Sequence, residues 1–346
     1  MENKVYIFKI DINWELIGLI SKIDRFDASW SSIEKREGQS LKQLKSISTV
    51  RSVGASTRME GSKMSDAEVD VLLKNIDITK LEDRDSQEVV GYFNTLDIIT
   101  ESYQDINITE SSIKNLHNIL LKYSKKDSWH KGNYKQHSNA VEANYPDGTK
   151  RILFETTEAG FPTEDAMRNL FKWYKTDKET HPLVKCASFC YEFVSIHPFQ
   201  DGNGRLSRLI ASLLLLKNGY KWIQYVSFEH EIESKKEEYY RVLRNCQSQR
   251  PNENITEWIS FFFNSLLNIQ NQLLQKLESS GLQSQLSPKE KSILTFIGNH
   301  SGCKSGNIAK KLDIPNPTVK RILSNLIERN LIEKHGNGPG TNYSLK

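Results

Sequence analysis

Residues 197–208 are His-Pro-Phe-Gln-Asp-Gly-Asn-Gly-Arg-Leu-Ser-Arg, and this stretch decides the fold. An apolar helical pattern precedes it and must end near His197, because the residue before a proline disfavours the α conformation. An apolar run over 206–216 then begins a second helix. The tract between the two helices is therefore predicted to be a loop that ends at a helix N-terminus.

This loop carries residues that suit phosphate chemistry. Its two glycines and its asparagine let backbone N–H groups curl around an anion, with help from the helix dipole. Arg205 and Arg208 are three residues apart on the first helical turn, so both are expected beside that anion. Asp201 is a hard oxygen ligand suited to Mg²⁺, and His197 can accept a proton near pH 7. The combination predicts transfer of a phosphoryl or nucleotidyl group, and the alternative is an ordinary helix–loop–helix with a surface histidine.

Helical periodicity dominates the chain on both sides of this loop. Apolar residues recur at helical spacing over 31–59, and Gly61 then offers a stop. Ser65 and Glu68 have the spacing of a capping box that opens the next helix. Further helices are predicted at 88–103, 110–121, 163–175, 182–196, 205–217, 234–246 and 255–277. The chain is therefore expected to be mainly helical.

Residues 138–156 depart from this helical pattern. They hold β-branched and aromatic residues around Tyr145-Pro-Asp-Gly148. This is a turn sequence, because proline presets φ and glycine supplies a positive φ. The segment predicts a lone β-hairpin, which must lie against the helical domain because an isolated hairpin is marginal in water.

The last sixty or so residues form a separate basic module. A polar stretch at 278–285 precedes it, and residues 285–346 carry a net charge of +6, whereas the rest of the chain sums to −2. The predicted elements are helices from 288, around 308–312 and from 315, then short strands at 331–334 and 343–345 around a glycine-rich turn. Three helices and a small hairpin predict a winged helix-turn-helix.

Composition limits the class of protein. The 346 residues leave room for two or three domains, and 37% hydrophobic residues are enough for real cores. No apolar run approaches the roughly 18 residues of a membrane span, and the first residues do not resemble a signal peptide. The four cysteines form no C-x-x-C pair. These features predict a cytoplasmic protein with no membrane partner, disulfide or structural zinc.

The segment 197–208 resembles the signature of the Fic family, His-Pro-Phe-x-Asp/Glu-Gly-Asn-Gly-Arg-x-x-Arg, at every position. The resemblance implies an all-helical core with a β-hairpin flap. It also implies transfer of AMP from Mg-ATP to a Ser, Thr or Tyr hydroxyl of a target protein. The flap at 138–156 would hold the target as an added strand.

The same resemblance assigns roles to the residues of the motif. It implies that His197 is the catalytic base that deprotonates the hydroxyl, and that Asp201 holds Mg²⁺. Nucleotide binding would involve Gly202, Asn203, Gly204, Arg205, Leu206, Ser207 and Arg208. Arg205 would bind the β-phosphate region and Arg208 the γ-phosphate.

Two further matches lie outside this segment. The run from Ser56 through Glu60 to Gly61 resembles the family's inhibitory pattern, Ser/Thr-x-x-x-Glu-Gly/Asn. It implies that Glu60 pairs with Arg208 and displaces the γ-phosphate, in the nucleotide-binding site itself. Tyr239 and Tyr240 resemble the tyrosines of a helix that lines the adenine pocket, although aromatic residues at this spacing also occur in plain cores.

The expected domains are an N-terminal helical region with the inhibitory helix (1–105), a Fic catalytic domain (106–277) and the winged helix (286–346). The winged helix can bind DNA, with Lys310, Lys311, Lys320 and Arg321 as phosphate contacts, or dock a protein, a second copy of the chain included. Three other functions stay open. They are removal of AMP, transfer of a different phosphate-containing group, and a transcription regulator whose Fic-like domain senses nucleotide.

Overall fold

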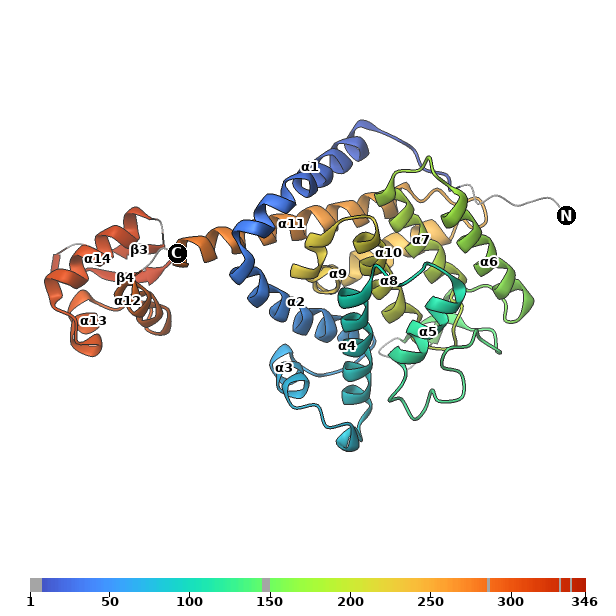
Figure 1. Ribbon diagram of the computed structural model, residues 1–346, viewed down its shortest axis with the longest axis horizontal. Coiled ribbons are helices and arrows are strands. Elements are labelled where there is room, and N and C mark those ends of the chain that lie inside the picture. Colours follow the sequence, from blue (N-terminus) through green and yellow to red (C-terminus); the bar gives the residue numbers. More distant parts are fainter. Residues whose placement is uncertain (1–7, 145–149, 285–286, 330, 337) are drawn as a thin grey trace. The chain divides into compact units, whose positions relative to one another are not determined.

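The computed structural model describes residues 8–144, 150–284, 287–329, 331–336 and 338–346 (Figure 1). The chain divides into two compact units, residues 1–274 and 275–346. Both units are mainly helical in the part of the chain described. None of the described helices is long and apolar enough to cross a membrane.

Over its described residues, the first unit is a bundle of helices with one pair of strands. Its helices are α1 (Trp14–Arg36), α2 (Gly38–Met59), α3 (Asp66–Lys74), α4 (Arg84–Ser102), α5 (Glu110–Leu120), α6 (Phe161–Thr176), α7 (Pro182–Ile196), α8 (Asn203–Lys217), α9 (Phe228–Ser234), α10 (Lys236–Gln247) and the part of α11 (Thr256–Ser284) that precedes residue 275. Short 3₁₀ turns lie at η1 (Ile78–Lys80) and η2 (Lys221–Tyr225). The capping box predicted at Ser65 and Glu68 is confirmed, with both of its hydrogen bonds at the start of α3.

Helices α7 and α8 form the centre of this unit, with other helices of the unit around them (Figure 1). Almost every residue of both helices is buried, as expected of helices that are apolar on all sides. Among the buried residues are Cys186 and Cys190, which are free thiols. The loop between the two helices therefore starts and ends at rigid, fully packed positions.

Several boundaries differ from the predicted ones, and helix α4 begins at Arg84 rather than at 88 because Asp83 caps it. The helix predicted over 31–59 is broken at Glu37, between α1 and α2. The helix predicted over 234–246 starts at Lys236 and is preceded by α9. Helix α8 starts at Asn203 rather than at 205, because Gly202 takes the left-handed conformation at its N-cap. The polar stretch from 278 continues α11 to Ser284, since serine and glutamine are tolerated in a helix that is already formed.

The segment 138–156 holds two strands, β1 (Ala140–Asn144) and β2 (Lys150–Glu155). They pair antiparallel from Ala140 opposite Glu155 to Asn144 opposite Lys150, with a register shift between Val141 and Glu142. The predicted turn at 145–148 lies outside the described residues.

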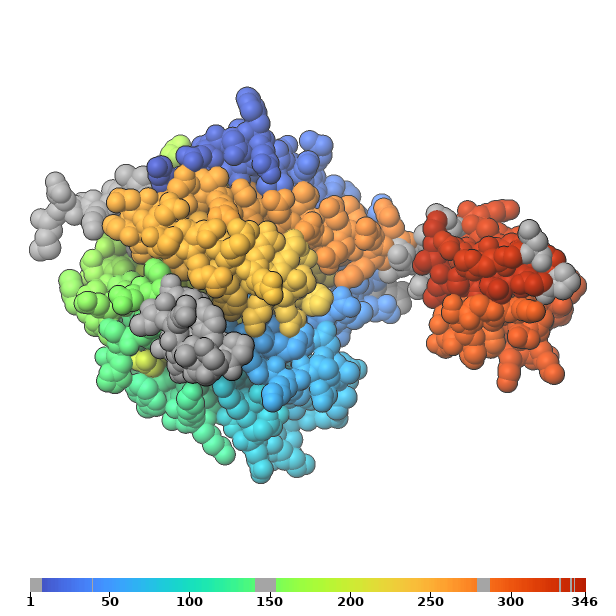
Figure 2. All heavy atoms as spheres, turned by 180° about the vertical axis from the view of Figure 1, so that it is seen from behind, coloured from blue at the N-terminus to red at the C-terminus, as the bar shows by residue number. Residues whose placement is uncertain are grey.

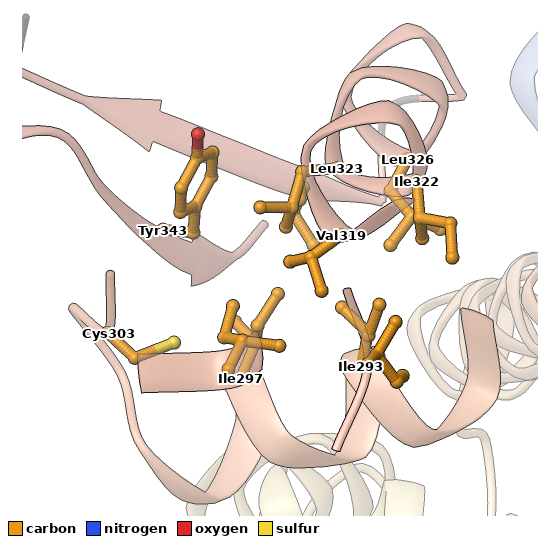
Figure 3. Packing of buried hydrophobic residues seen from close by; sticks show 11 residues of the cluster. Ile293, Ile297, Cys303, Val319, Ile322, Leu323, Leu326 and Tyr343 are labelled. Carbon is orange, nitrogen blue, oxygen red and sulfur yellow. The ribbon is translucent and has the colours of Figure 1, made fainter. Parts of the chain in front are cut away.

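The second unit has its own hydrophobic core. Its elements are α12 (Pro288–Asn299), α13 (Ser305–Leu312), α14 (Asn316–Glu328), β3 (Ile332–His335), the 3₁₀ turn η3 (Gly338–Gly340) and β4 (Asn342–Leu345). Strands β3 and β4 pair antiparallel. Ile293 and Ile297 of α12 pack with Val319 and Leu323 of α14 and with Tyr343 of β4 (Figure 3).

The packing of α4 against α5 yields a stability prediction. A Cβ atom at Gly91 of α4 would lie 2.1 Å from the carbonyl oxygen of Leu120 in α5, so the backbone would have to move. Gly91→Ala should lower the free energy of unfolding by about 1–3 kcal/mol in urea titrations. The control is Gly18→Ala in α1, where a Cβ meets nothing within 4 Å. That variant should gain about 0.5–1 kcal/mol from helix propensity, and equal stabilities of the two variants would disprove the close approach.

Candidate active site

His197 ends α7 in the left-handed conformation, with φ 54° and ψ 60°. Its Nδ1 lies 3.2 Å from the carbonyl oxygen of Val194, which can only accept, so Nδ1 carries the proton and Nε2 has the lone pair. The pKa of His197 is lowered to about 4. Burial is the main cause and the nearby Lys135 ammonium adds to it, whereas the hydrogen bond to the Val194 carbonyl acts to raise the pKa. The imidazole is therefore neutral at pH 7 and able to accept a proton at Nε2.

The loop after His197 is held by Asn203. The Asn203 Oδ1 accepts from the backbone N–H of Phe199 at 2.9 Å, and Nδ2 donates to the Phe199 carbonyl at 2.7 Å. Asn203 is only 1% exposed. Its side chain thus shapes the loop from inside rather than facing a ligand.

His117 of α5 fixes the backbone of Asp201, a role that the sequence did not reveal. Its Nδ1 accepts from the N–H of Gly132 at 2.9 Å, so Nε2 donates to the Asp201 carbonyl at 2.9 Å. The ring stacks on Phe199 with centroids 3.8 Å apart. Burial lowers the pKa of His117 to about 4, so it stays neutral and keeps this tautomer.

Asp201 and Arg205 are joined to each other. The Asp201 Oδ1 accepts from the N–H of Gly202 at 2.5 Å and from Arg205 Nη2 at 3.2 Å. Arg205 is 1% exposed, and its Nη1 lies 3.3 Å from Oε2 of Glu88 in α4, another residue the sequence did not indicate. Burial acts to raise the pKa of Asp201, but the Arg205 charge and the Gly202 N–H outweigh it, so the carboxylate is ionised.

Arg208 is bound by the end of α2. It is 3% exposed. Its Nε donates to Ser56 Oγ at 2.8 Å, and its Nη2 donates to the Ser56 carbonyl at 3.0 Å and to Glu60 Oε1 at 2.8 Å. Burial acts to raise the pKa of Glu60, yet the charges of Arg208 and Arg205 bring it below its ordinary value. The structure thus brings Ser56 and Glu60, from the segment 56–61, into contact with Arg208 of the segment 197–208.

Gly204 leaves room for the Glu60 carboxylate. A Cβ atom at Gly204 would lie 2.5 Å from Glu60 Oε1. The carboxylate therefore rests on the first turn of α8, where backbone N–H groups lack intrahelical partners and the helix dipole favours negative charge. Glu60 lies where this helix would receive an anion.

The end of α2 is fastened by Arg58. Its Nε and Nη2 bind both carboxylate oxygens of Glu233 in α9, at 2.7 and 2.9 Å. Its Nη1 donates to Asp66 Oδ1 at 2.8 Å. Lys236 Nζ donates to the Met59 carbonyl at 3.4 Å, and the surface view shows α10 bordering this part of the chain (Figure 2).

The remaining predicted residues differ in accessibility. Tyr239 is buried against Trp258, with ring centroids 5.7 Å apart, whereas Tyr240 is partly exposed beside it. Leu206 and Ser207 are buried in α8, so the structure does not bring their side chains to the loop surface. The N–H of Leu206 is also committed, to the Gly202 carbonyl.

Residues 107–215 match the model of the Fic/DOC family. The chain is 26% identical over 207 residues to "Protein adenylyltransferase Fic" of Drosophila melanogaster, over 58% of this chain and 39% of that protein. It is also 25% identical over 207 residues to the protein of the same name from Drosophila mojavensis, over 58% and 38%. The chain thus spans about 40% of the length of the curated relatives it matches.

Two solved structures share the fold. A Fic family protein from Desulfovibrio desulfuricans G20 has a TM-score of 0.65 at 23% identity, covering 99% of this chain and 98% of that chain. A Fic domain containing signaling protein from Bacteroides thetaiotaomicron VPI-5482 has a TM-score of 0.59 at 21% identity, covering 75% and 97%.

Asn203 provides a test of the loop geometry. Asn203→Ala should lower the free energy of unfolding by about 1–3 kcal/mol, because the buried N–H of Phe199 would lose the Asn203 side chain as its acceptor and the Phe199 carbonyl would keep only Asn139 as its donor. Chemical denaturation measures this change. The control is Asn133→Ala, an exposed residue whose amide lies 3.5 Å from its acceptor and should contribute little. Equal losses in the two variants would show that Asn203 does not hold the loop.

Proposed function

We propose that this Fic family protein transfers AMP from Mg-ATP to a Ser, Thr or Tyr hydroxyl of a target protein, and that Glu60 restrains the reaction. One observation carries the proposal: a neutral His197 lies beside a helix N-terminus where Glu60 holds the buried Arg208. The curated relatives named protein adenylyltransferase support the same class of reaction.

In the proposed reaction, Nε2 of His197 accepts the proton of the target hydroxyl. The hydroxyl oxygen forms a bond to the α-phosphorus while the bond from that phosphorus to the α,β-bridging oxygen breaks. AMP stays on the target and pyrophosphate leaves. Backbone N–H groups at 203 and 204 and Arg205 would bind the phosphates, whereas the N–H of Gly202 donates to Asp201 in this structure. Arg208 would bind the γ-phosphate, and Tyr240 would border the adenine.

Asp201 fits a magnesium ion that arrives with the nucleotide. Its side chain is 35% exposed, and it is an ionised oxygen donor. Among the described residues there is no cluster of three or more metal-ligating side chains. Asp201 would therefore supply one ligand and the phosphates others, as is usual for Mg²⁺. When bound, the ion would neutralise charge on the phosphates.

Glu60 would inhibit by occupying the position of an anion. A carboxylate on Arg208 and on the first turn of α8 competes with the γ-phosphate for the same guanidinium. Transfer of a different phosphate-containing group would use the same residues, and so would removal of AMP by a water molecule held at Glu60. A chain that only senses nucleotide for transcription would need no base at 197.

The proposed domains are 1–105 with the inhibitory helix α2, 106–277 as the catalytic domain and 286–346 as a winged helix. Strands β1 and β2 would be the flap that receives the target protein. The four free, buried cysteines are consistent with the cytoplasmic location that we propose.

Labelled ATP tests the proposed reaction. With Mg²⁺ present, label from the α position should appear on protein, whereas label from the γ position should not. Glu60→Gly should raise this labelling at least about tenfold, since a charge-assisted hydrogen bond of about 1.5–3 kcal/mol no longer competes. His197→Ala in that background should lower the rate about 10²–10⁴-fold while ATP still binds.

Two results would refute this assignment. Transfer of γ-label to protein would make the reaction a phosphoryl transfer. If Glu60→Gly labels no better than the parent at any ATP concentration, Glu60 does not inhibit. Release of AMP from a modified target by the parent, but not by Glu60→Gly, would favour AMP removal.

Arg58 offers a second route to the same activation. Because Arg58 fastens the end of α2 to Glu233 and Asp66, Arg58→Met should loosen Glu60 and raise α-label incorporation, though less than Glu60→Gly does. In the Glu60→Gly background the same change should add nothing. The control is Arg241→Met, which breaks an exposed pair with Glu257. Activation by both arginine variants alike would rule out a specific role for Arg58.

The basic second unit is proposed to contact nucleic acid. Lys310, Lys311, Lys320 and Arg321 are exposed on α13 and α14. The full chain should then bind duplex DNA with an affinity that falls steeply with salt. Lys320→Ala with Arg321→Ala should reduce the slope of log K against log salt by roughly two, about 0.9 for each phosphate contact. No DNA binding at low salt would instead favour protein docking or association of two copies.

A further inference from the structure

A buried lysine lies between the β1–β2 hairpin and His197. Lys135 is 2% exposed, and its ammonium group donates to Asn139 Oδ1 at 2.9 Å, Thr156 Oγ1 at 2.8 Å and the Ile196 carbonyl at 3.2 Å. All three acceptors are neutral. None of the ion pairs found among the described residues includes Lys135, so only hydrogen bonds to neutral groups hold its charge, and burial lowers its pKa to about 8.

Two of these acceptors lie side by side at the open end of the hairpin, where β1 begins and β2 ends. Asn139 immediately precedes β1, and Thr156 immediately follows β2. The Thr156 hydroxyl also lies 2.6 Å from Asn139 Oδ1 and 2.7 Å from the Asn139 carbonyl. Lys135 therefore joins the ends of the two strands in one buried polar cluster.

The other partners of this cluster surround His197 in the sequence. Besides the Ile196 carbonyl, the backbone N–H of Lys135 donates to the Pro198 carbonyl at 2.8 Å. The Asn139 Nδ2 donates to the Phe199 carbonyl at 3.0 Å. Residues on both sides of His197 are thus hydrogen-bonded to Lys135 and Asn139, which lie next to the open end of the hairpin.

We propose that Lys135 is a positioning residue, which fixes the hairpin relative to His197 so that a protein bound along the hairpin presents its hydroxyl to Nε2. The proposal rests on the AMP transfer proposed above. It assigns to Lys135 the alignment of the hairpin, along which the target strand would bind, with the base His197. A displacement of about 1 Å between reacting groups can reduce a rate by roughly 10²-fold, so such an alignment matters.

The charge of Lys135 adds a second, separable effect. The charged groups that act on His197 are Lys135, Glu60 and Asp201, of which the lysine disfavours an imidazolium and the two carboxylates favour it. Loss of the lysine charge should raise the pKa of His197. The base would then be protonated at higher pH, so the acid side of the pH–rate profile should move to higher pH.

The experiment uses the full chain with Glu60→Gly as parent and measures α-label transfer to protein against pH. Lys135→Met should lower transfer roughly 10- to 100-fold, leave ATP affinity unchanged and move the acid side to higher pH. Lys135→Arg should recover part of the rate and restore the acid side. Thr156→Val, which keeps the charge, should lower transfer without moving the profile. Lys125→Met, an exposed lysine of the preceding loop, should match the parent.

Hydrogen exchange supplies a readout that needs no activity. In Lys135→Met, amides of β1 and β2 should exchange faster while those of α7 stay protected. Unchanged exchange in β1 and β2, or a Lys135→Met variant with parental rate and pH profile, would overturn the proposal. If the parent transfers no AMP, the proposed reaction fails, and hydrogen exchange still decides whether Lys135 anchors the hairpin.

Discussion

Burial of the Arg208 guanidinium is the constraint on which the site depends. A cation that is 3% exposed is costly unless it is paired and hydrogen-bonded. The end of α2 meets this requirement with the Ser56 hydroxyl, the Ser56 carbonyl and the Glu60 carboxylate. The start of α8 and the end of α2 therefore have to meet, although more than 140 residues separate them. Gly204 permits the meeting because it has no side chain where Glu60 lies.

A single anion position follows from this geometry. The first turn of α8 and Arg208 favour negative charge, and only one group can occupy that place. With Glu60 present the cation is satisfied from within the protein, and without it the same donors suit a phosphate. In the mechanism that we propose, the affinity of this position for anions would serve both inhibition by Glu60 and binding of the nucleotide. Release of Glu60 requires movement of the end of α2, which Arg58 fastens to α9.

The sequence predicted the features that depend on neighbouring residues, such as where a helix begins and ends. The bounds of α7 were predicted residue for residue, because a proline opens the helix and His197-Pro198 closes it. The resemblance also predicted that Glu60 pairs with Arg208, and the structure places Glu60 and Ser56 in contact with Arg208. His117, Glu88 and Lys135 were missed, since each acts on a partner far along the chain, 84 residues away for His117. The spacing of Ile113, Leu116 and Leu120 places His117 on the apolar face of its helix, so its burial was predictable although its partner was not. Lys135 lies in a polar segment that gives no sign of burial.

The most direct measurement of competition at Arg208 is calorimetric comparison of ATP with ADP, each with Mg²⁺. In the unmodified protein, which has Glu60, the two nucleotides should bind with similar affinity, because Glu60 already occupies Arg208. In Glu60→Gly, ATP should bind about tenfold or more tightly than ADP, as expected for a charge-assisted hydrogen bond to the γ-phosphate. Adding Arg208→Ala should abolish that preference. The same ratio of ATP to ADP affinity in the unmodified protein and in Glu60→Gly would contradict the account.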